Sequence, residues 1–386
     1  MGLMDVEEVV AARPEQLQTF HSRSFVAALR NSSKLKEEER LRFGLTDDCS
    51  VFDDLLDLVL LETGGSLKAA DLLAQGEYQV AIWWGGGRHH AKGSVAAGYC
   101  YANDAVLAIF QLLETFERIM YIDIDVHHGD GVEEAFSSSD KVLTISFHHF
   151  APLFFPGSGA LMEQSGHQGK RCVINVPLKE GCDDETFTRM FEFVISRASE
   201  RFRPSMVVMQ CGADSLHGDP LGEFNLSSSG YVRCLELVQQ LKIPMLVLGG
   251  GGYNAVNVAK LWTILTFKCG GHEAPAEIPG TCPDYEDYAP DFLLEVRPGY
   301  RKNCNDEAYV DMLKKVIESS LRLCGEEGAR SPQVQSIAEG KEDTESTQEQ
   351  EEGDINKVFV TEAAGGREED EGPQESSSQE EQSQTS

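Results

Sequence analysis

Short apolar runs rich in Val and Ile alternate along the chain with longer segments of helical periodicity. The runs are nearly continuous in hydrophobicity, which is typical of strands buried on both faces of a sheet. They cover residues 79–84, 118–125, 142–147, 172–178, 206–212 and 245–252. Helical patterns between them include residues 103–116, 183–202 and 254–267. This alternation predicts an α/β fold with a mostly parallel central sheet and helices on both faces. In such a fold ligands bind beyond the carboxyl ends of the strands.

The composition of the chain changes near residue 325. Residues 326–386 are dominated by Glu, Gln, Ser and Gly, and their one apolar patch is "VFV" at 358–360. They hold 18 Asp and Glu against 4 Lys and Arg. The sequence therefore predicts one folded domain, residues 1–325, followed by a disordered acidic tail, residues 326–386.

The net charge limits which classes of partner the protein is expected to bind. The formal charge is −31, of which −14 lies in residues 326–386 and −17 in residues 1–325. A chain this acidic should not bind nucleic acid unaided, whereas a cationic peptide or polyamine would be drawn toward it. No stretch approaches the roughly 20 apolar residues of a membrane span, and the N-terminus does not look like a signal peptide, so we expect an intracellular protein without membrane contact. The ten cysteines form no C-x-x-C pair, which favours reduced, packed thiols.

Titratable side chains are concentrated in "YIDIDVHHGDG", residues 121–131. Asp123, Asp125 and His127 follow one another at intervals of two at a strand end, so their side chains leave the same face. Each alone has an ordinary structural explanation, such as a helix N-cap for an acid, but the whole cluster does not. Asp214, in "MVVMQCGADS", follows another strand end, where a third ligand must sit. Two carboxylates and one imidazole with open positions suit a catalytic zinc ion.

A histidine pair follows the first of the six apolar runs, in "GGGRHHAKG". His89 and His90 could be two unrelated surface residues, but here they stand at a strand end that faces the same crevice. Asp123 and Asp130 could each accept the far N–H of one of these histidines, which would fix its tautomer and raise its basicity.

A further strand ends in "LGGGGYN", which brings Tyr253 to the crevice. The glycines lack the context of a dinucleotide-binding turn, and no Lys-Ser/Thr follows them as in a P-loop. Close approach of substrate to the glycine backbone, with the Tyr253 hydroxyl reaching in, is the better interpretation.

Six motifs in order resemble the signatures of the class I, zinc-dependent histone deacetylases: "GGGRHHAK", "GYCYANDAVLAI", "YIDIDVHHGDGVEEAF", "FFPGSG", "QCGADSLHGDPLGEFNL" and "LGGGGYN". The resemblance runs from about residue 14 to about residue 323. It implies the single-domain arginase/deacetylase fold, with a parallel sheet of about eight strands. It also implies hydrolysis of the acetyl amide of N6-acetyl-lysine in histones or other proteins, and a role in chromatin and transcription regulation. The implied location is the nucleus, with the cytoplasm as a further location, and corepressor subunits are implied as partners.

The resemblance also assigns roles by matching position. The zinc ligands would be Asp125, His127 and Asp214. The catalytic residues would be His90 as general base, His89 as electrostatic assistant, their partners Asp123 and Asp130, and Tyr253 as donor to the oxyanion. The substrate would be bound by Asp48, Tyr99, Phe155, Gly251 and Leu221. A structural potassium ion is implied at Asp123, Asp125, His127, Ser146 and Phe147.

The sequence departs from the family in several places. Tyr99 stands where the family usually has Phe, which predicts retained activity with altered inhibitor preference. Pro220 and Val256 replace basic residues that bind inositol phosphates in corepressor complexes, which argues against the same assembly. The family's domain normally has a strand and a helix, with an arginine near the foot of the cavity, ahead of the segment that opens this sequence. Without them we expect the sheet to lack an edge strand, with effects on stability and acetate exit.

Three other interpretations remain open at this level. A deacetylase of acetylated polyamines would use the same fold. A scaffold would keep the fold without turnover. An arginase-like two-metal hydrolase is disfavoured because Gly129 stands where a second-metal carboxylate would be expected.

Overall fold

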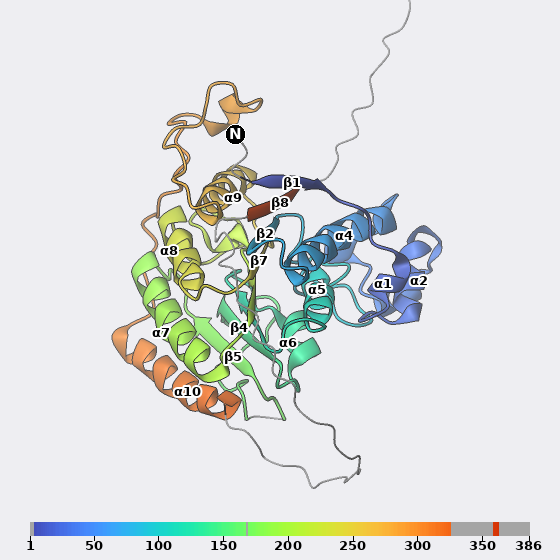
Figure 1. The fold of residues 1–386 in the computed structure, drawn as a ribbon, viewed down its shortest axis with the longest axis horizontal. Coiled ribbons are helices and arrows are strands. Elements are labelled where there is room, and N and C mark those ends of the chain that lie inside the picture. Colours follow the sequence, from blue (N-terminus) through green and yellow to red (C-terminus); the bar gives the residue numbers. More distant parts are fainter. Residues whose placement is uncertain (1–3, 167–168, 326–357, 363–386) are drawn as a thin grey trace, which may run out of the picture.

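The computed structural model describes residues 4–166, 169–325 and 358–362 (Figure 1). At its centre is an eight-stranded sheet in the order β1-β8-β2-β7-β6-β3-β4-β5, in which all pairings are parallel. The strands are β1 Asp5–Glu8, β2 Val80–Trp83, β3 Ile119–Asp123, β4 Val142–His149, β5 Val173–Leu178, β6 Met206–Gln210, β7 Met245–Leu248 and β8 Val358–Glu362. Each of the six apolar runs overlaps one strand, β2 to β7, so the predicted parallel α/β sheet is confirmed.

Helices cover both faces of this sheet (Figure 1). The α-helices are α1 Pro14–Leu17, α2 Arg23–Arg30, α3 Glu37–Arg42, α4 Leu55–Ala74, α5 Asp104–Leu112, α6 Asp130–Phe136, α7 Asp184–Phe202, α8 Ser228–Gln239, α9 Ala255–Cys269 and α10 Glu307–Gly325. Short 3-10 turns lie at Ser32–Lys34, Asp47–Cys49, Ala213–Ser215 and Tyr285–Tyr288. One hydrophobic core joins the sheet to α7, α8, α9 and α10, and a second joins the opposite face to α4, α5 and α6.

The helices on both faces of the sheet explain why the strands are hydrophobic along their whole length. In β6, Val207 and Met209 pack into the core beneath α7 and α8, while Val208 points into the core beneath α4 and α5. Because every position of such a strand is buried on one face or the other, apolar residues fill most of it, and the polar Gln210 stands at its carboxyl end.

Capping side chains set the starts of the three predicted helices. Asn103, Asp183 and Asn254 each accept a hydrogen bond from the backbone N–H three residues later. Such a bond satisfies one of the free N–H groups of a helical first turn. Accordingly α5, α7 and α9 each begin one residue after the start that the pattern predicted.

The predicted tail contains a strand. Residues 358–362 form β8, which pairs with β1 on one side and β2 on the other, so disorder was the wrong prediction for these five residues. Val and Phe have high strand propensity, which the acidic average of the segment hides. The rest of residues 326–386 lies outside the described residues, and its disorder stays a prediction. The expected loss of an edge strand is not seen, since the described sheet has the eight strands that the resemblance implies.

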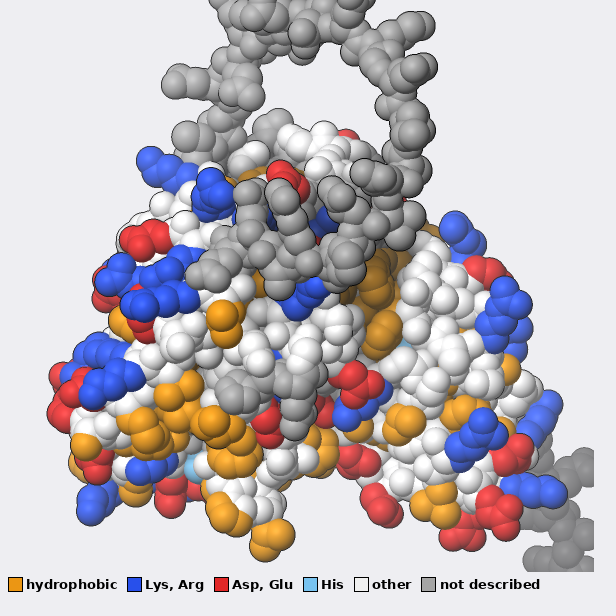
Figure 2. All heavy atoms as spheres, turned by 90° about the horizontal axis from the view of Figure 1, so that it is seen from below, with side chains coloured by type: hydrophobic (Ala, Val, Ile, Leu, Met, Phe, Trp, Pro, Cys, Tyr) orange, Lys and Arg blue, Asp and Glu red, His pale blue; other side chains and the backbone are white. Residues whose placement is uncertain are grey.

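The predicted packing of the thiols fits the structure. All ten cysteines are free, and seven of them are buried. On the face shown in Figure 2, acidic and basic side chains are interspersed around hydrophobic ones. In the part of the chain that the structure describes, no helix has the length and hydropathy to cross a membrane.

Candidate active site

Three predicted ligands meet where the strands end. Asp125 and His127 follow β3, and Asp214 lies in the 3-10 turn after β6. Because β3 and β6 are neighbouring parallel strands, their carboxyl ends meet at one edge. One ligand atom from each of the three side chains lies within 4.8 Å of the others, and all three residues are buried. Nδ1 of His127 is 3.1 Å from Oδ1 of Asp125 and 3.1 Å from Oδ2 of Asp214.

Neighbouring groups hold the two carboxylates in place. Oδ2 of Asp125 accepts hydrogen bonds from Nε2 of Gln210 and the backbone N–H of Gly251, each at 2.9 Å. Oδ1 of Asp214 accepts the N–H of Val126 at 2.8 Å. A Cβ at Gly251 would lie 2.2 Å from Oδ2 of Asp214, so only glycine fits there. Gly251, predicted to line the passage, thus lies directly against Asp125 and Asp214, two of the three predicted metal ligands.

The histidine pair comes from the loop after β2. Nδ1 of His89 lies 2.8 Å from Oδ2 of Asp123, and Nδ1 of His90 lies 2.8 Å from Oδ1 of Asp130. The two rings are 3.9 Å apart. Each carboxylate accepts the Nδ1–H of its histidine. In the neutral form of the ring, Nδ1 therefore carries the proton and Nε2 carries none. The structure therefore brings together the four residues that the sequence paired.

Charge and burial act differently on the two histidines. Burial disfavours a charged His89, but Asp123 and Asp125 outweigh it and raise the pKa of His89 to about 9. For His90, burial and the neighbouring His89 lower the pKa to about 3. His90 is therefore neutral and can accept a proton at neutral pH.

The pKa values of the two ligand carboxylates are also strongly shifted. Burial and the charge of Asp125 raise the pKa of Asp214 to about 7. Burial opposes ionisation of Asp125 as well, but His89 and His127 hold its pKa well below the usual value for a carboxyl group. Two carboxylates this close are poorly neutralised by one imidazole, which is the electrostatic situation that a cation relieves.

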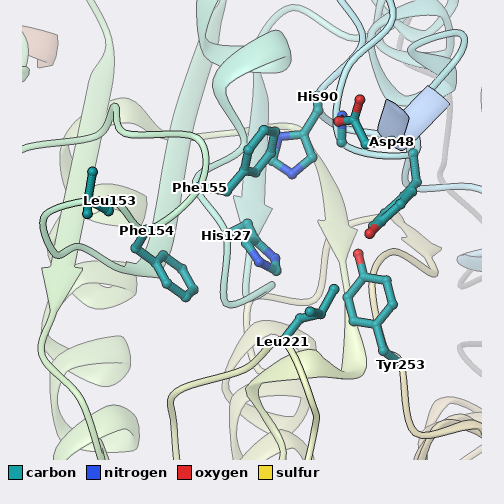
Figure 3. Close-up of a pocket in the computed structure, with 10 residues that line it drawn as sticks. Asp48, His90, His127, Leu153, Phe154, Phe155, Leu221 and Tyr253 are labelled. Carbon is teal, nitrogen blue, oxygen red and sulfur yellow. The ribbon is translucent and has the colours of Figure 1, made fainter. Parts of the chain in front are cut away.

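A pocket of about 290 Å³ leads to these residues. It is lined by Asp48, His90, Gly98, Tyr99, His127, Leu153, Phe154, Phe155, Leu221 and Tyr253. Figure 3 shows Phe155 beside His90 and His127, with Tyr253 and Leu221 across from them. The ring centroids of Phe155 and His90 are 4.9 Å apart. Four of the five predicted substrate-binding residues line this pocket.

The rim of the pocket carries polar and aromatic groups. Oδ2 of Asp48 accepts the N–H of Gly98 at 2.7 Å, so the two segments that carry Asp48 and Tyr99 are joined. The ring of Tyr99 is half exposed and lies 5.6 Å from the ring of Tyr253. Burial, then the charges of the ligand carboxylates, raise the pKa of Tyr253, so its hydroxyl keeps its proton and can donate it.

Asp219 is a residue of this site that the sequence did not single out. Its Oδ1 accepts the N–H groups of Leu221 and Gly222 at 2.9 and 3.1 Å, and its Oδ2 accepts the N–H of Tyr253 at 2.7 Å. One buried carboxylate thus joins the Leu221 wall to the loop that carries the tyrosine. An acid before a Pro-Leu-Gly turn was the available signal, since Asp commonly accepts N–H groups one to three residues later.

Other contributors to the site were also missed. Phe154 stacks on His127 with ring centroids 5.2 Å apart, although only its neighbour Phe155 had been assigned. The Tyr121 hydroxyl donates to Oδ2 of Asp123 at 2.7 Å. Leu153 lines the pocket with a fully exposed side chain and a left-handed backbone, φ 67°. These contacts could not be derived from the sequence, because they depend on the conformations of the loops.

Two of the five positions implied for potassium, Asp125 and His127, are also predicted zinc ligands. Asp123 and Ser146 are cross-strand partners in β3 and β4, and Phe147 is fully buried. Gly129 packs against Asp123, since a Cβ there would be 2.3 Å from Oδ2. Within the described ranges the one cluster suited to a metal is the Asp125, His127 and Asp214 group.

Comparisons with known proteins identify the family of the chain. Residues 2–269 match the histone deacetylase domain family. The chain is 44% identical over 339 residues to histone deacetylase 9 of Arabidopsis thaliana, covering 86% of this chain and 79% of the relative. It is 42% identical over 342 residues to human histone deacetylase 1, covering 87% of this chain and 70% of the relative. The chain belongs to the histone deacetylase family, as the six motifs predicted.

Proposed function

We propose that this protein is a zinc-dependent lysine deacetylase, which hydrolyses the acetyl amide of N6-acetyl-lysine in histone tails or other proteins and releases acetate. The observation that carries the proposal is the convergence of Asp125, His127 and Asp214 at the end of a pocket that also contains His90 and Tyr253. Family membership supports the same reaction.

The residues present fit a zinc ion. Two carboxylates and one imidazole nitrogen match the ligand types of catalytic zinc, which keeps a further position open. The raised pKa of Asp214 shows a buried acid whose charge calls for a cation. Gln210 and Gly251 orient Asp125 in the way that outer-shell partners orient metal ligands. We assign zinc to this site and potassium to the group around Asp123 and Ser146.

A bound zinc ion would polarise the acetyl carbonyl and increase the acidity of a water molecule. His90 has the position and the neutral state to take the proton of the attacking water at Nε2. Asp130, on its Nδ1, stabilises the imidazolium that forms. His90 then delivers the proton to the lysine amine that leaves. His89, held by Asp123, supplies positive potential beside it.

Tyr253 is the donor to the oxyanion that develops on the acetyl carbonyl. Its phenol is protonated and lies on the opposite side of the pocket from His90 (Figure 3). Removing one such donor typically lowers turnover by about 100- to 1000-fold. The lysine methylenes would lie between Phe155 and Tyr99, with Leu221 beside them, and Asp48 at the rim would accept substrate backbone N–H groups.

The remaining assignments are proposals of the same kind. The catalytic domain is residues 1–325, since α10 packs against α7 and β5 beyond the end of the family match, and strand β8 completes its sheet. A nuclear location is proposed because histone tails are the proposed substrates, with the cytoplasm as a further location. Corepressor subunits are proposed as partners, through contacts other than an inositol phosphate site at Pro220 and Val256.

The test is a direct assay of acetate release. Zinc-loaded protein is given an acetyl-lysine histone peptide and, separately, an acetylated polyamine. Tyr253→Phe and His90→Ala should lower peptide turnover by about 100-fold or more. Tyr300→Phe and His272→Ala are matched controls, because both side chains are exposed and distant in sequence from the pocket residues.

Each outcome decides between the interpretations. Turnover of the peptide that depends on Tyr253 and His90 supports the proposal. A preference for the polyamine by orders of magnitude would favour the polyamine deacetylase, and no acetate from either substrate would favour the scaffold.

A further inference from the structure

Strand β8 reaches the sheet from far along the sequence. It lies between β1 and β2, although 32 residues separate the end of α10 from its first residue. Figure 1 shows β8 beside β1, at the side of the sheet where α4 lies. The strand is parallel to both neighbours, and α4 also contacts it.

The backbone of β8 pairs with a neighbouring strand on each side. Phe359 pairs with Asp5 of β1 and Ala81 of β2, and Val360 pairs with Val6 and Ile82. Among the described strands, β8 is the sheet partner of β1, so β1 joins the sheet through it. Without β8, one edge of β2 would present unpaired N–H and C=O groups.

The slot that β8 fills adjoins the catalytic loop. β2 ends at Trp83, and the chain continues directly through residues 84–88 to His89 and His90. The other neighbour of β2 is β7, which leads to the glycine turn before Tyr253. β2 is therefore held between β8 and β7, the strand that leads to Tyr253. Because His89 and His90 follow β2 closely in the chain, the position of β2 sets the position of this histidine pair.

We propose that the slot between β1 and β2 is a strand-binding site whose ligand is the chain's own segment 358–362, and that its occupation holds the His89–His90 loop in place. The ligand chemistry is that of an extended apolar segment which pairs through its backbone on both edges. The binding part stands on the strand pairing alone, and the effect on turnover rests on the proposed function.

The chain's own segment is the occupant that the sequence favours. The 32 residues between α10 and β8 span up to about 110 Å when extended, whereas a domain of 325 residues has a radius of gyration of about 20 Å. The tether therefore reaches any point of its own domain. It also keeps the segment at a high effective concentration, which favours its own strand over one from a second copy.

The experiment compares the full chain with a protein that ends at Gly325. We expect the truncated protein to melt at least about 5 °C lower. We also expect the backbone amides of residues 80–83 to exchange at least about 10-fold faster with deuterium. A synthetic peptide of residues 354–365, added in excess, should reverse both changes.

Two controls make the result specific. The same peptide with Phe359→Pro should not restore protection, because proline lacks the N–H and does not fit between two strands. A chain that ends at residue 362 keeps β8 and should behave as the full chain. If the protein that ends at Gly325 does not fold, the full-length Val360→Pro variant provides the same exchange measurement.

Unchanged melting and unchanged exchange in β2 after truncation would overturn the proposal, as would equal rescue by the proline peptide. Sedimentation of the full chain should show a monomer. A dimer that becomes monomeric when the tail is removed would mean that a second copy supplies the strand. Because melting and exchange need no substrate, a failure here is distinct from a failure of the deacetylase assignment. If both hold, peptide addition should also raise acetate release by the truncated protein.

Discussion

Replacing Asp219 by Asn tests whether the Tyr253 loop must be held by a carboxylate. The two oxygens of Asp219 accept three backbone N–H groups, and the residue is 8% exposed. An Asn side chain can keep its oxygen toward Leu221 and Gly222, which preserves two of these bonds. Its NH₂ group then faces the N–H of Tyr253, so one buried donor loses its acceptor.

The structure sets the size of the effect. One buried N–H without a partner costs about 1–3 kcal/mol of folding free energy. A catalytic group displaced by about 1 Å can lose about 100-fold in rate. We therefore expect Asp219→Asn to lower kcat/KM by about 10- to 100-fold, with most of the loss in kcat. Asp219→Ala leaves all three N–H groups without their acceptor and should destabilise the fold more than Asp219→Asn does.

The assay measures acetate release together with zinc affinity by titration calorimetry. Zinc affinity should not change, because Asp219 makes no hydrogen bond to Asp125, His127 or Asp214. Asp140→Asn is the matched control, since that side chain is 73% exposed. Wild-type turnover in Asp219→Asn, or a parallel loss of zinc binding, would refute the reasoning.

Three further predictions follow from the same geometry. Gly251→Ala should abolish zinc binding in calorimetry, because its Cβ would lie 2.2 Å from Oδ2 of Asp214, whereas Gly280→Ala, with no atom within 4 Å, should bind normally. Burial lowers the pKa of His21 from 6.5 to about 4, so its contribution to stability is full above pH 6.5 and is lost as the pH falls toward 4. In urea unfolding, the loss of stability between pH 7 and pH 5 should be about 2 kcal/mol smaller in His21→Asn than in the wild type; equal pH dependence in both would contradict this. Removing the metal with a chelator should lower the melting temperature, and zinc at 100 times its dissociation constant should restore about 2.7 kcal/mol; no change on chelation would contradict a buried site.

The sequence predicted the parts of the site that lie at strand ends. A strand has a period of two, and parallel neighbours end at one edge, so Asp125, His127 and Asp214 could be brought together from pattern alone. The pairing of His89 with Asp123 and of His90 with Asp130 was implied by the family resemblance, and the structure has both contacts.

What the sequence did not predict depends on loop conformation and on long-range pairing. The three bonds of Asp219 require the exact turn between Asp214 and Leu221, which no periodicity encodes. The stacking of Phe154 on His127 depends on the path of the loop after β4. β8 was missed because five residues of strand propensity stand in an acidic segment, and their partners are more than 270 residues away in the sequence.

The central claim is that Asp125, His127 and Asp214 hold one zinc ion at the end of the pocket. Crystals of the zinc-loaded protein, measured on both sides of the zinc absorption edge, test it directly. The account predicts one anomalous peak about 2.0–2.2 Å from Nδ1 of His127 and from an oxygen of each carboxylate. A peak elsewhere, or a second one of equal height in the same pocket, would contradict it.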